Sequence, residues 1–222
     1  MIIAIDGPAA SGKSTTAKKI AELLDLMYLD TGAMYRATAL YLKRKNVDIN
    51  DFIALETSIE KIQIQFKKTA QNKEYQIILN NDDISEEIRT PQITKLSSEI
   101  ATIGIVRKKM VEIQREMAQN HNVILDGRDI GTIVFPNADF KFYITASLET
   151  RANRRYKELK AKGVDIEIEQ IKQDLIWRDQ NDQNRDIAPL KKADDAIEIN
   201  TTNMTIKEQT NFIIKHIRKS LA

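Results

Sequence analysis

Short apolar runs alternate with amphipathic helical patterns along most of this chain. Residues 2–5 are almost all apolar, a glycine-bearing polar turn follows, and apolar side chains then recur at helical spacing from Ala17 to Leu24. A strand, a loop and a helix in this order are typical of the opening of a parallel α/β sheet. Further apolar runs predict more strands of the same sheet, at residues 26–29, 123–125, 140–144 and 196–199.

The pattern changes to a period of two near residue 60. Apolar and polar side chains alternate over residues 62–66 and again over 75–79, with a polar turn at residues 71–73 between them. This alternation predicts an antiparallel hairpin with one solvated face, which does not belong in a buried parallel sheet. We therefore expect a core of residues 1–59 and 96–222 and a small inserted lobe of residues 60–95.

Composition narrows the class of protein. The chain has 222 residues, of which 42% are hydrophobic, enough for one packed α/β core with a small appended subdomain. Its net charge of +2, with 30% charged residues, gives no support for a broad nucleic-acid or membrane surface. The absence of cysteine excludes disulfides and cysteine-ligated zinc, and the two histidines, His121 and His216, lack the spacing of metal ligands.

The sequence also predicts the cellular location and the oligomeric state. No apolar run approaches the roughly 20 residues of a membrane span, and the N-terminal run lacks the basic region of a signal peptide. We expect a cytoplasmic protein without a membrane or nucleic-acid partner. We also expect a monomer, because no long exposed apolar stripe is left over.

One motif carries specific chemistry. Residues 7–14 read G-P-A-A-S-G-K-S and fit the phosphate-loop pattern G-x-x-x-x-G-K-[ST] at every fixed position. The glycines allow backbone N–H groups to point at phosphate oxygens, Lys13 would reach the β- and γ-phosphates, and the Ser14 hydroxyl would ligate Mg²⁺. The predicted strand before the motif and helix after it are the expected context, so we predict an ATP site formed by Gly7, Pro8, Ala9, Ala10, Ser11, Gly12, Lys13, Ser14 and Thr15.

A phosphate loop alone does not separate a kinase from a nucleotide switch. The chain has no N-K-x-D segment, so it lacks the guanine-reading element of GTPases. A small-molecule kinase needs cations for a second phosphate and a lid that excludes water. Arg36 and Arg128 follow predicted strands, so they are placed at the strand ends, where ligands bind in such sheets.

An ordinary surface position would also explain some of the arginines of this chain. Arg151, Arg154 and Arg155 share one helical face, which fits a solvated surface as well as a lid. Asp179 and Arg185 fit a surface ion pair. The segment D-G-R-D-I-G at residues 126–131 is different. A charged turn with two glycines directly after an apolar strand is a better candidate for a functional site than for a purely structural connection.

At this point the chain resembles the bacterial cytidylate kinases, a family of nucleoside monophosphate kinases. The resemblance runs nearly end to end, through I-D-G-P at residues 5–8, D-T-G-A-M-Y-R at 30–36, I-R-T at 88–90, L-D-G-R-D-I-G-T-I-V-F-P at 125–136, R-D-Q-N-D-Q-N-R at 178–185 and A-P-L at 188–190. Thr31 stands where serine is common, and Asn200-Thr201 stands where Asp-Ser or Asp-Thr is more usual.

The resemblance implies fold, reaction and site residues. The fold is an α/β P-loop three-layer sandwich with a parallel central sheet, an antiparallel inserted lobe and a helical lid at about residues 148–165. The reaction transfers the γ-phosphate of ATP to CMP or dCMP with Mg²⁺. Arg36, Arg128 and Arg185 would hold the acceptor phosphate, and Ser98, Arg107 and Asp129 would read the base. Further contacts with the nucleotides fall to Thr31, Arg178 and Asp182 for the acceptor and to Arg151, Arg154 and Arg155 in the lid.

Alternatives stay open at this stage. A related kinase acting on UMP, dTMP or AMP would share the phosphate loop. A non-catalytic nucleotide switch would lack a second set of phosphate-binding arginines. An RNA-associated protein would need more positive charge than +2 and interleaved aromatic residues.

Overall fold

The structure is a computed structural model, and it describes residues 1–68, 75–161 and 163–221. The chain divides into two compact units. Unit 1 comprises residues 1–28 and 120–222, and unit 2 comprises residues 29–119. Each unit has its own packed elements.

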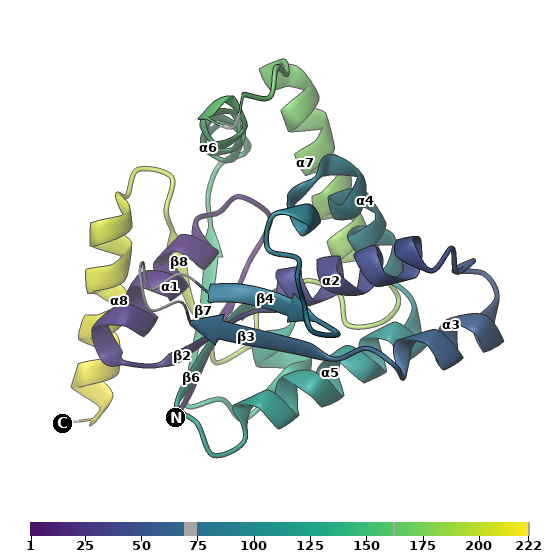
Figure 1. The fold of residues 1–222 in the computed structure, drawn as a ribbon. Coiled ribbons are helices and arrows are strands. Elements are labelled where there is room, and N and C mark those ends of the chain that lie inside the picture. The colour runs from purple at the N-terminus through teal and green to yellow at the C-terminus, as the bar shows by residue number, and fades with distance from the viewer. Residues whose placement is uncertain (69–74, 162, 222) are drawn as a thin grey trace. The chain divides into compact units, whose positions relative to one another are not determined.

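A parallel sheet forms the centre of unit 1 (Figure 1). Among the described residues its strands lie in the order β2 (Met27–Asp30), β6 (Val123–Gly127), β1 (Ile2–Asp6), β7 (Phe140–Thr145) and β8 (Ile197–Asn200). β2 begins in unit 1 and ends in unit 2. The central strands β1 and β6 are buried along almost their whole length, as expected where helices cover both faces of a parallel sheet. The predicted parallel sheet is confirmed.

Two pairs of helices complete unit 1. α1 (Lys13–Leu24) packs with α8 (Ile206–Leu221), and α6 (Leu148–Ala161) packs with α7 (Ile168–Asn184). The α6–α7 pair buries an apolar cluster that also contains Ala9 of the phosphate loop. Apolar contact therefore joins the predicted lid helix to the loop that it is expected to cover.

Unit 2 contains the predicted hairpin. β3 (Ile64–Lys68) pairs antiparallel with β4 (Tyr75–Leu79), and β5 (Asp82–Asp83) extends the sheet. The hairpin prediction is confirmed, although its turn at residues 71–73 lies outside the described residues. The helices of this unit are α2 (Thr31–Arg44), α3 (Phe52–Ile59), α4 (Pro91–Ile100) and α5 (Gly104–Ala118), with a 3₁₀ turn at Glu87–Arg89.

One apolar core holds unit 2 together. It takes buried residues from α2, α3, the hairpin, α4 and α5, including Met34, Leu55, Ile77 and Met110. The compact unit around the hairpin thus spans residues 29–119, while the narrower inserted lobe at 60–95 stays a prediction. Asp30 ends β2, and its side chain accepts a hydrogen bond from Ala33 N, which caps α2 directly.

None of the helices in the described part of the chain has the length and apolar character that crossing a bilayer requires.

Candidate active site

The phosphate loop takes a backbone path that only glycine permits at two positions. Gly7 follows β1 at φ 150°, and a Cβ there would lie 2.1 Å from the carbonyl oxygen of Ile144. Gly12, at φ 96°, is the residue before α1. Together they let the chain turn sharply from β1 into α1, so that the amino end of the helix faces the loop. The motif therefore has the context that its sequence predicts.

Lys13 is the first residue of α1 and is almost fully buried. Its Nζ lies 3.1 Å from the carbonyl oxygen of Pro8, to which it donates a hydrogen bond. Burial lowers the pKa of Lys13 to about 7, and the nearby guanidinium groups of Arg128 and Arg178 lower it as well, against the carboxylates of Asp126 and Asp182. The loop lysine and two of the predicted acceptor-site arginines therefore share one electrostatic environment.

Ser14 contacts a carboxylate that the sequence analysis did not assign a role. Its Oγ donates a 2.5 Å hydrogen bond to Oδ2 of Asp126, which is the penultimate residue of β6 and is 3% exposed. The other carboxylate oxygen, Oδ1, accepts a 2.6 Å hydrogen bond from the hydroxyl of buried Tyr28. The sequence signal was an aspartate at the end of the strand beside the loop strand, but the contact joins residues 112 positions apart.

This pair of oxygens fits a magnesium site. A hydroxyl and a carboxylate are hard oxygen ligands, and Mg²⁺ usually binds one or two carboxylates together with substrate phosphates rather than a cage of protein ligands. Among the described residues no group of three or more His, Cys, Asp or Glu side chains could hold a metal. Ser14 and Asp126 are the residues that would hold the ion.

Two of the acceptor-site arginines of unit 1 are paired with carboxylates. Arg128 Nε lies 2.6 Å from Asp182 Oδ2, and Arg185 Nη2 lies 3.5 Å from Asp129 Oδ1. All four side chains are at least four-fifths buried. Burial raises the pKa of Asp182, but the guanidinium groups of Arg128, Arg178 and Arg185 together lower it below its usual value. These four residues form one charged cluster rather than surface pairs.

Two of the three arginines on α6 contact the phosphate loop. Arg151 pairs with Asp179 at 2.7 Å and also donates to the carbonyl oxygen of Ala9. Arg154 donates to the carbonyl oxygens of Ser11 and Thr201. For these two, the solvated-face interpretation is wrong.

Arg155 is different from its two neighbours on α6. It pairs with Glu158 one turn along its own helix, where both side chains are partly exposed. The structure does not bring Arg155 to the loop, and its role in a lid stays a prediction.

The remaining predicted acceptor residues lie in unit 2. Arg36 pairs with Asp30 at 3.4 Å, and Thr31 is buried at the start of α2. On α4, Ser98 Oγ donates to the carbonyl oxygen of Thr94. Arg107 on α5 is 3% exposed, donates to the carbonyl oxygen of Ala101 and lies with its guanidinium carbon 5.9 Å from the Tyr35 ring centre. A buried arginine stacked on an aromatic ring is held in one orientation, as recognition of a ligand requires.

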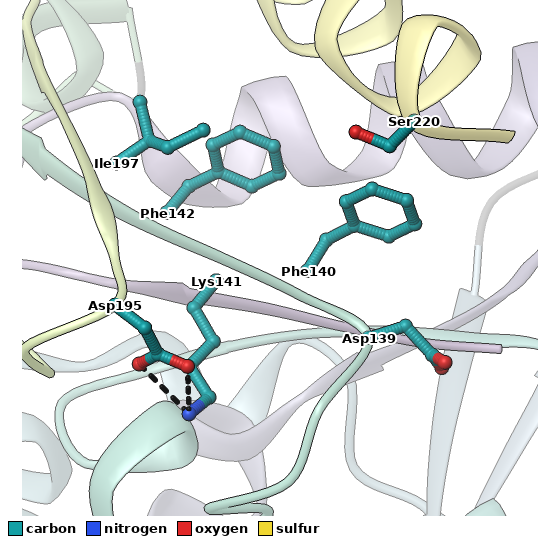
Figure 2. Close-up of a pocket in the computed structure, with 7 residues that line it drawn as sticks. All are labelled: Asp139, Phe140, Lys141, Phe142, Asp195, Ile197 and Ser220. Carbon is teal, nitrogen blue, oxygen red and sulfur yellow. Dashed lines mark hydrogen bonds and ion pairs between the residues drawn. The ribbon is translucent and has the colours of Figure 1, made fainter.

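A surface pocket lies elsewhere on unit 1 and is not part of this site (Figure 2). Asp139 and Phe140 line it where β7 begins, and Phe140 is paired with Ile3 near the start of β1. The phosphate loop follows the other end of β1, so the pocket faces the amino ends of the strands. Figure 2 shows Lys141 in the pocket wall, occupied by its ion pair with Asp195.

Comparison with known proteins identifies the family. The family model described as cytidylate kinase matches residues 3–219. A cytidylate kinase of Lactobacillus johnsonii is 48% identical over 219 residues, covering 99% of this chain and 94% of the relative. The cytidylate kinase of Halalkalibacterium halodurans is 45% identical over 219 residues, covering 99% and 98%. That of Clostridium acetobutylicum is 46% identical over the same length.

A solved structure supports the fold alone. An uncharacterised protein from Eubacterium ventriosum aligns with a TM-score of 0.54 at 15% identity, covering 98% of each chain.

Proposed function

The chain belongs to the cytidylate kinase family, and we propose that it transfers the γ-phosphate of ATP to CMP or dCMP, giving ADP and CDP or dCDP. One observation supports this most directly. Arg151 and Arg154 contact the phosphate loop, and a second set of arginines, Arg128 and Arg185, is paired with Asp182 and Asp129 in the same unit. A nucleotide switch has no need for this second set, whereas a kinase that joins two phosphates does.

The phosphoryl donor would bind at the loop. Backbone N–H groups of residues 7–14 and the amino end of α1 bind the ATP phosphates, and Lys13 carries the balancing charge. Ser14 and Asp126 would hold Mg²⁺, which when bound neutralises charge that develops between the β- and γ-phosphates. Arg151 and Arg154, already attached to the loop carbonyls, approach from α6 and help to exclude water.

The acceptor would bind where carboxylates now hold the arginines. Arg128 and Arg185 are held by Asp182 and Asp129, so a phosphate can take up contacts with guanidinium groups that are already oriented. We assign Arg36 of unit 2 to the same phosphate and Arg178 and Asp182 to the sugar. Because a nucleoside monophosphate oxygen is anionic near neutral pH, the transfer needs alignment and charge balance but no dedicated general base.

Base recognition would distinguish cytosine from uracil. Asp129 accepts a hydrogen bond from the cytosine amino group, while Ser98 and Arg107 donate to the ring acceptors. Uracil would place its O4 acceptor against the carboxylate, and such a mismatch costs about 1–3 kcal/mol, so CMP is preferred to UMP by roughly ten- to a hundred-fold. A cytoplasmic location and a monomeric state stay predictions from the sequence.

The variant Arg128→Ala tests the acceptor assignment. It should lose most CMP-dependent turnover while keeping ATP affinity, measured by titration calorimetry with a non-hydrolysable ATP analogue. The matched control is Arg115→Ala, which removes an arginine of α5 that has no assigned role in the site. Unchanged CMP kinetics in Arg128→Ala would refute the assignment.

A further inference from the structure

Asp6 makes a contact that neither the sequence motifs nor the proposed chemistry uses. It is the last residue of β1, is 4% exposed, and precedes the phosphate loop directly. Its Oδ1 accepts a 2.8 Å hydrogen bond from Ile130 N, and its Oδ2 accepts a 2.8 Å hydrogen bond from Gly131 N. One carboxylate thus binds two successive backbone N–H groups of the D-G-R-D-I-G turn, 124 and 125 positions along the chain.

The two N–H groups belong to the first turn of a short helical segment. Residues Ile130–Val134 form a single π-helical turn, and the leading N–H groups of a helix have no partner within it. An aspartate in the capping position ordinarily supplies the acceptor. Here Asp129 occupies that position but makes no capping hydrogen bond. Asp6 supplies the cap from a neighbouring strand instead.

Because Asp6 provides the cap, the carboxylate of Asp129 is engaged elsewhere. Asp129 Oδ1 lies 3.5 Å from Arg185 Nη2, and the side chain does not cap the helical turn that follows it. The turn also carries Arg128, whose guanidinium faces Asp182. Asp6, on the strand that leads into the loop, thus binds the backbone of the two residues that directly follow Arg128 and Asp129.

The chemistry of the contact requires a carboxylate. Two N–H donors need two acceptor oxygens, and an ionised carboxylate offers both, whereas a carboxamide offers one oxygen and turns an NH₂ donor toward the second N–H. Burial raises the pKa of Asp6 to about 7, against the hydrogen bonds from Gly131 and Ile130, and the neighbouring charge of Asp129 raises it further while Lys13 lowers it. The ionised carboxylate that both N–H groups require is therefore the main form of Asp6 above about pH 7.

We propose that Asp6 is a positioning residue for the acceptor nucleotide, which holds the Arg128–Gly131 turn against β1 so that Asp129 faces the base instead of capping its own helix. The inference rests on the proposed function, since it concerns the same acceptor. Through Asp6, β1, which leads into the phosphate loop, would also position the turn that carries Arg128 and Asp129.

The variant Asp6→Asn tests this. We expect the KM for CMP to rise about ten-fold, the preference for CMP over UMP to fall by a similar factor, and the KM for ATP to stay within about two-fold, as for the loss of one buried charge-assisted hydrogen bond. The intact mass of the variant must be checked, because an asparagine followed by glycine deamidates readily to isoaspartate and aspartate.

The chain offers a matched control. Asp139 also accepts a hydrogen bond from a backbone N–H, that of Ile2, but at the opposite end of β1 from the phosphate loop. Asp139→Asn should leave both KM values and the CMP preference unchanged. If Asp6→Asn keeps the wild-type KM for CMP and the wild-type preference, or raises the KM for ATP and CMP equally, the positioning role is refuted.

A second variant decides the matter should Asp6→Asn fail to fold. In Gly131→Ala the new methyl would lie 3.1 Å from Lys141 Cδ and 3.4 Å from Asp6 Oδ2, so it crowds the contact between Asp6 and the turn without altering any charge. A raised KM for CMP with an unchanged KM for ATP supports the proposal, and an unchanged KM for CMP contradicts it. Failure of wild-type protein to phosphorylate CMP would instead refute the proposed function.

Discussion

Ser14 Oγ and Asp126 Oδ2 are 2.5 Å apart, and this hydrogen bond joins the last residue of the phosphate loop to the end of the neighbouring strand. The second oxygen of Asp126 is held by Tyr28, so the carboxylate has one fixed orientation. A hydroxyl and a carboxylate held together in this way would form the protein's part of the proposed Mg²⁺ site, which substrate phosphates would complete. Metal affinity should therefore depend on both contacts of Asp126.

Replacement of Asp126 by Asn should weaken metal binding more than nucleotide binding. The variant loses a negative charge beside Ser14 but keeps a side chain of the same size. We expect the Mg²⁺ concentration for half-maximal activity to rise about ten-fold or more, as for loss of a charged ligand. Electron paramagnetic resonance of Mn²⁺ with a non-hydrolysable ATP analogue measures the same loss without turnover. Wild-type Mn²⁺ affinity in the variant would contradict the assignment.

The hydroxyl of Tyr28 should act on the metal through Asp126. Tyr28→Phe removes the hydrogen bond to Oδ1 and leaves the buried ring in place. Partners that orient a ligating carboxylate are worth about ten-fold or more in metal affinity. We expect weaker Mn²⁺ binding, with activity restored at high Mg²⁺ and an unchanged KM for CMP.

Tyr41→Phe is the control for this change, because Tyr41 is a buried tyrosine of the unit 2 core. An equal effect of the two substitutions on Mn²⁺ affinity would show that Tyr28 has no special relation to Asp126.

The stability of the protein should depend on pH through Asp6. Its pKa is raised from 3.8 to about 7 in the folded chain, chiefly by burial, so the folded state holds the proton more tightly than the unfolded state. The stability that this group contributes is complete below about pH 4 and is lost as the pH rises through about 7. Because Asp129 and Lys13 also act on this group, the measurement must be a difference between wild type and Asp6→Asn.

Urea unfolding at several pH values supplies that difference. Between about pH 5 and pH 8, the free energy of unfolding of wild type should fall relative to Asp6→Asn by about 3 kcal/mol. A difference that is constant with pH, or that grows in favour of wild type, would contradict the raised pKa.

Local patterns predicted much of this molecule. The apolar run before the phosphate loop, the glycines at positions 7 and 12, and the alternation on both sides of residue 70 specify their structures within a few neighbouring residues. Sequence reasoning likewise singled out the D-G-R-D-I-G turn, because charge and glycine there follow an apolar strand.

Contacts over long separations were beyond such reasoning. The cap that Asp6 provides for Ile130, and the pairing of Arg151 with Asp179 on another helix, arise only when the sheet and the helices have assembled. Helical spacing placed Arg151 and Arg155 on similar faces, yet one is 7% exposed and ion-paired across helices while the other pairs within its own helix. Burial of a long charged side chain depends on tertiary neighbours that a single helix pattern does not contain.

Acceptor choice tests the central claim most directly. A coupled assay of ADP release, with saturating ATP and Mg²⁺, gives kcat/KM for CMP, dCMP, UMP, dTMP and AMP in turn. The account predicts that CMP or dCMP is the best acceptor, with UMP at least about ten-fold poorer, and that ATP hydrolysis without an acceptor is negligible. A higher kcat/KM for UMP, dTMP or AMP, or hydrolysis that is independent of acceptor, would contradict it.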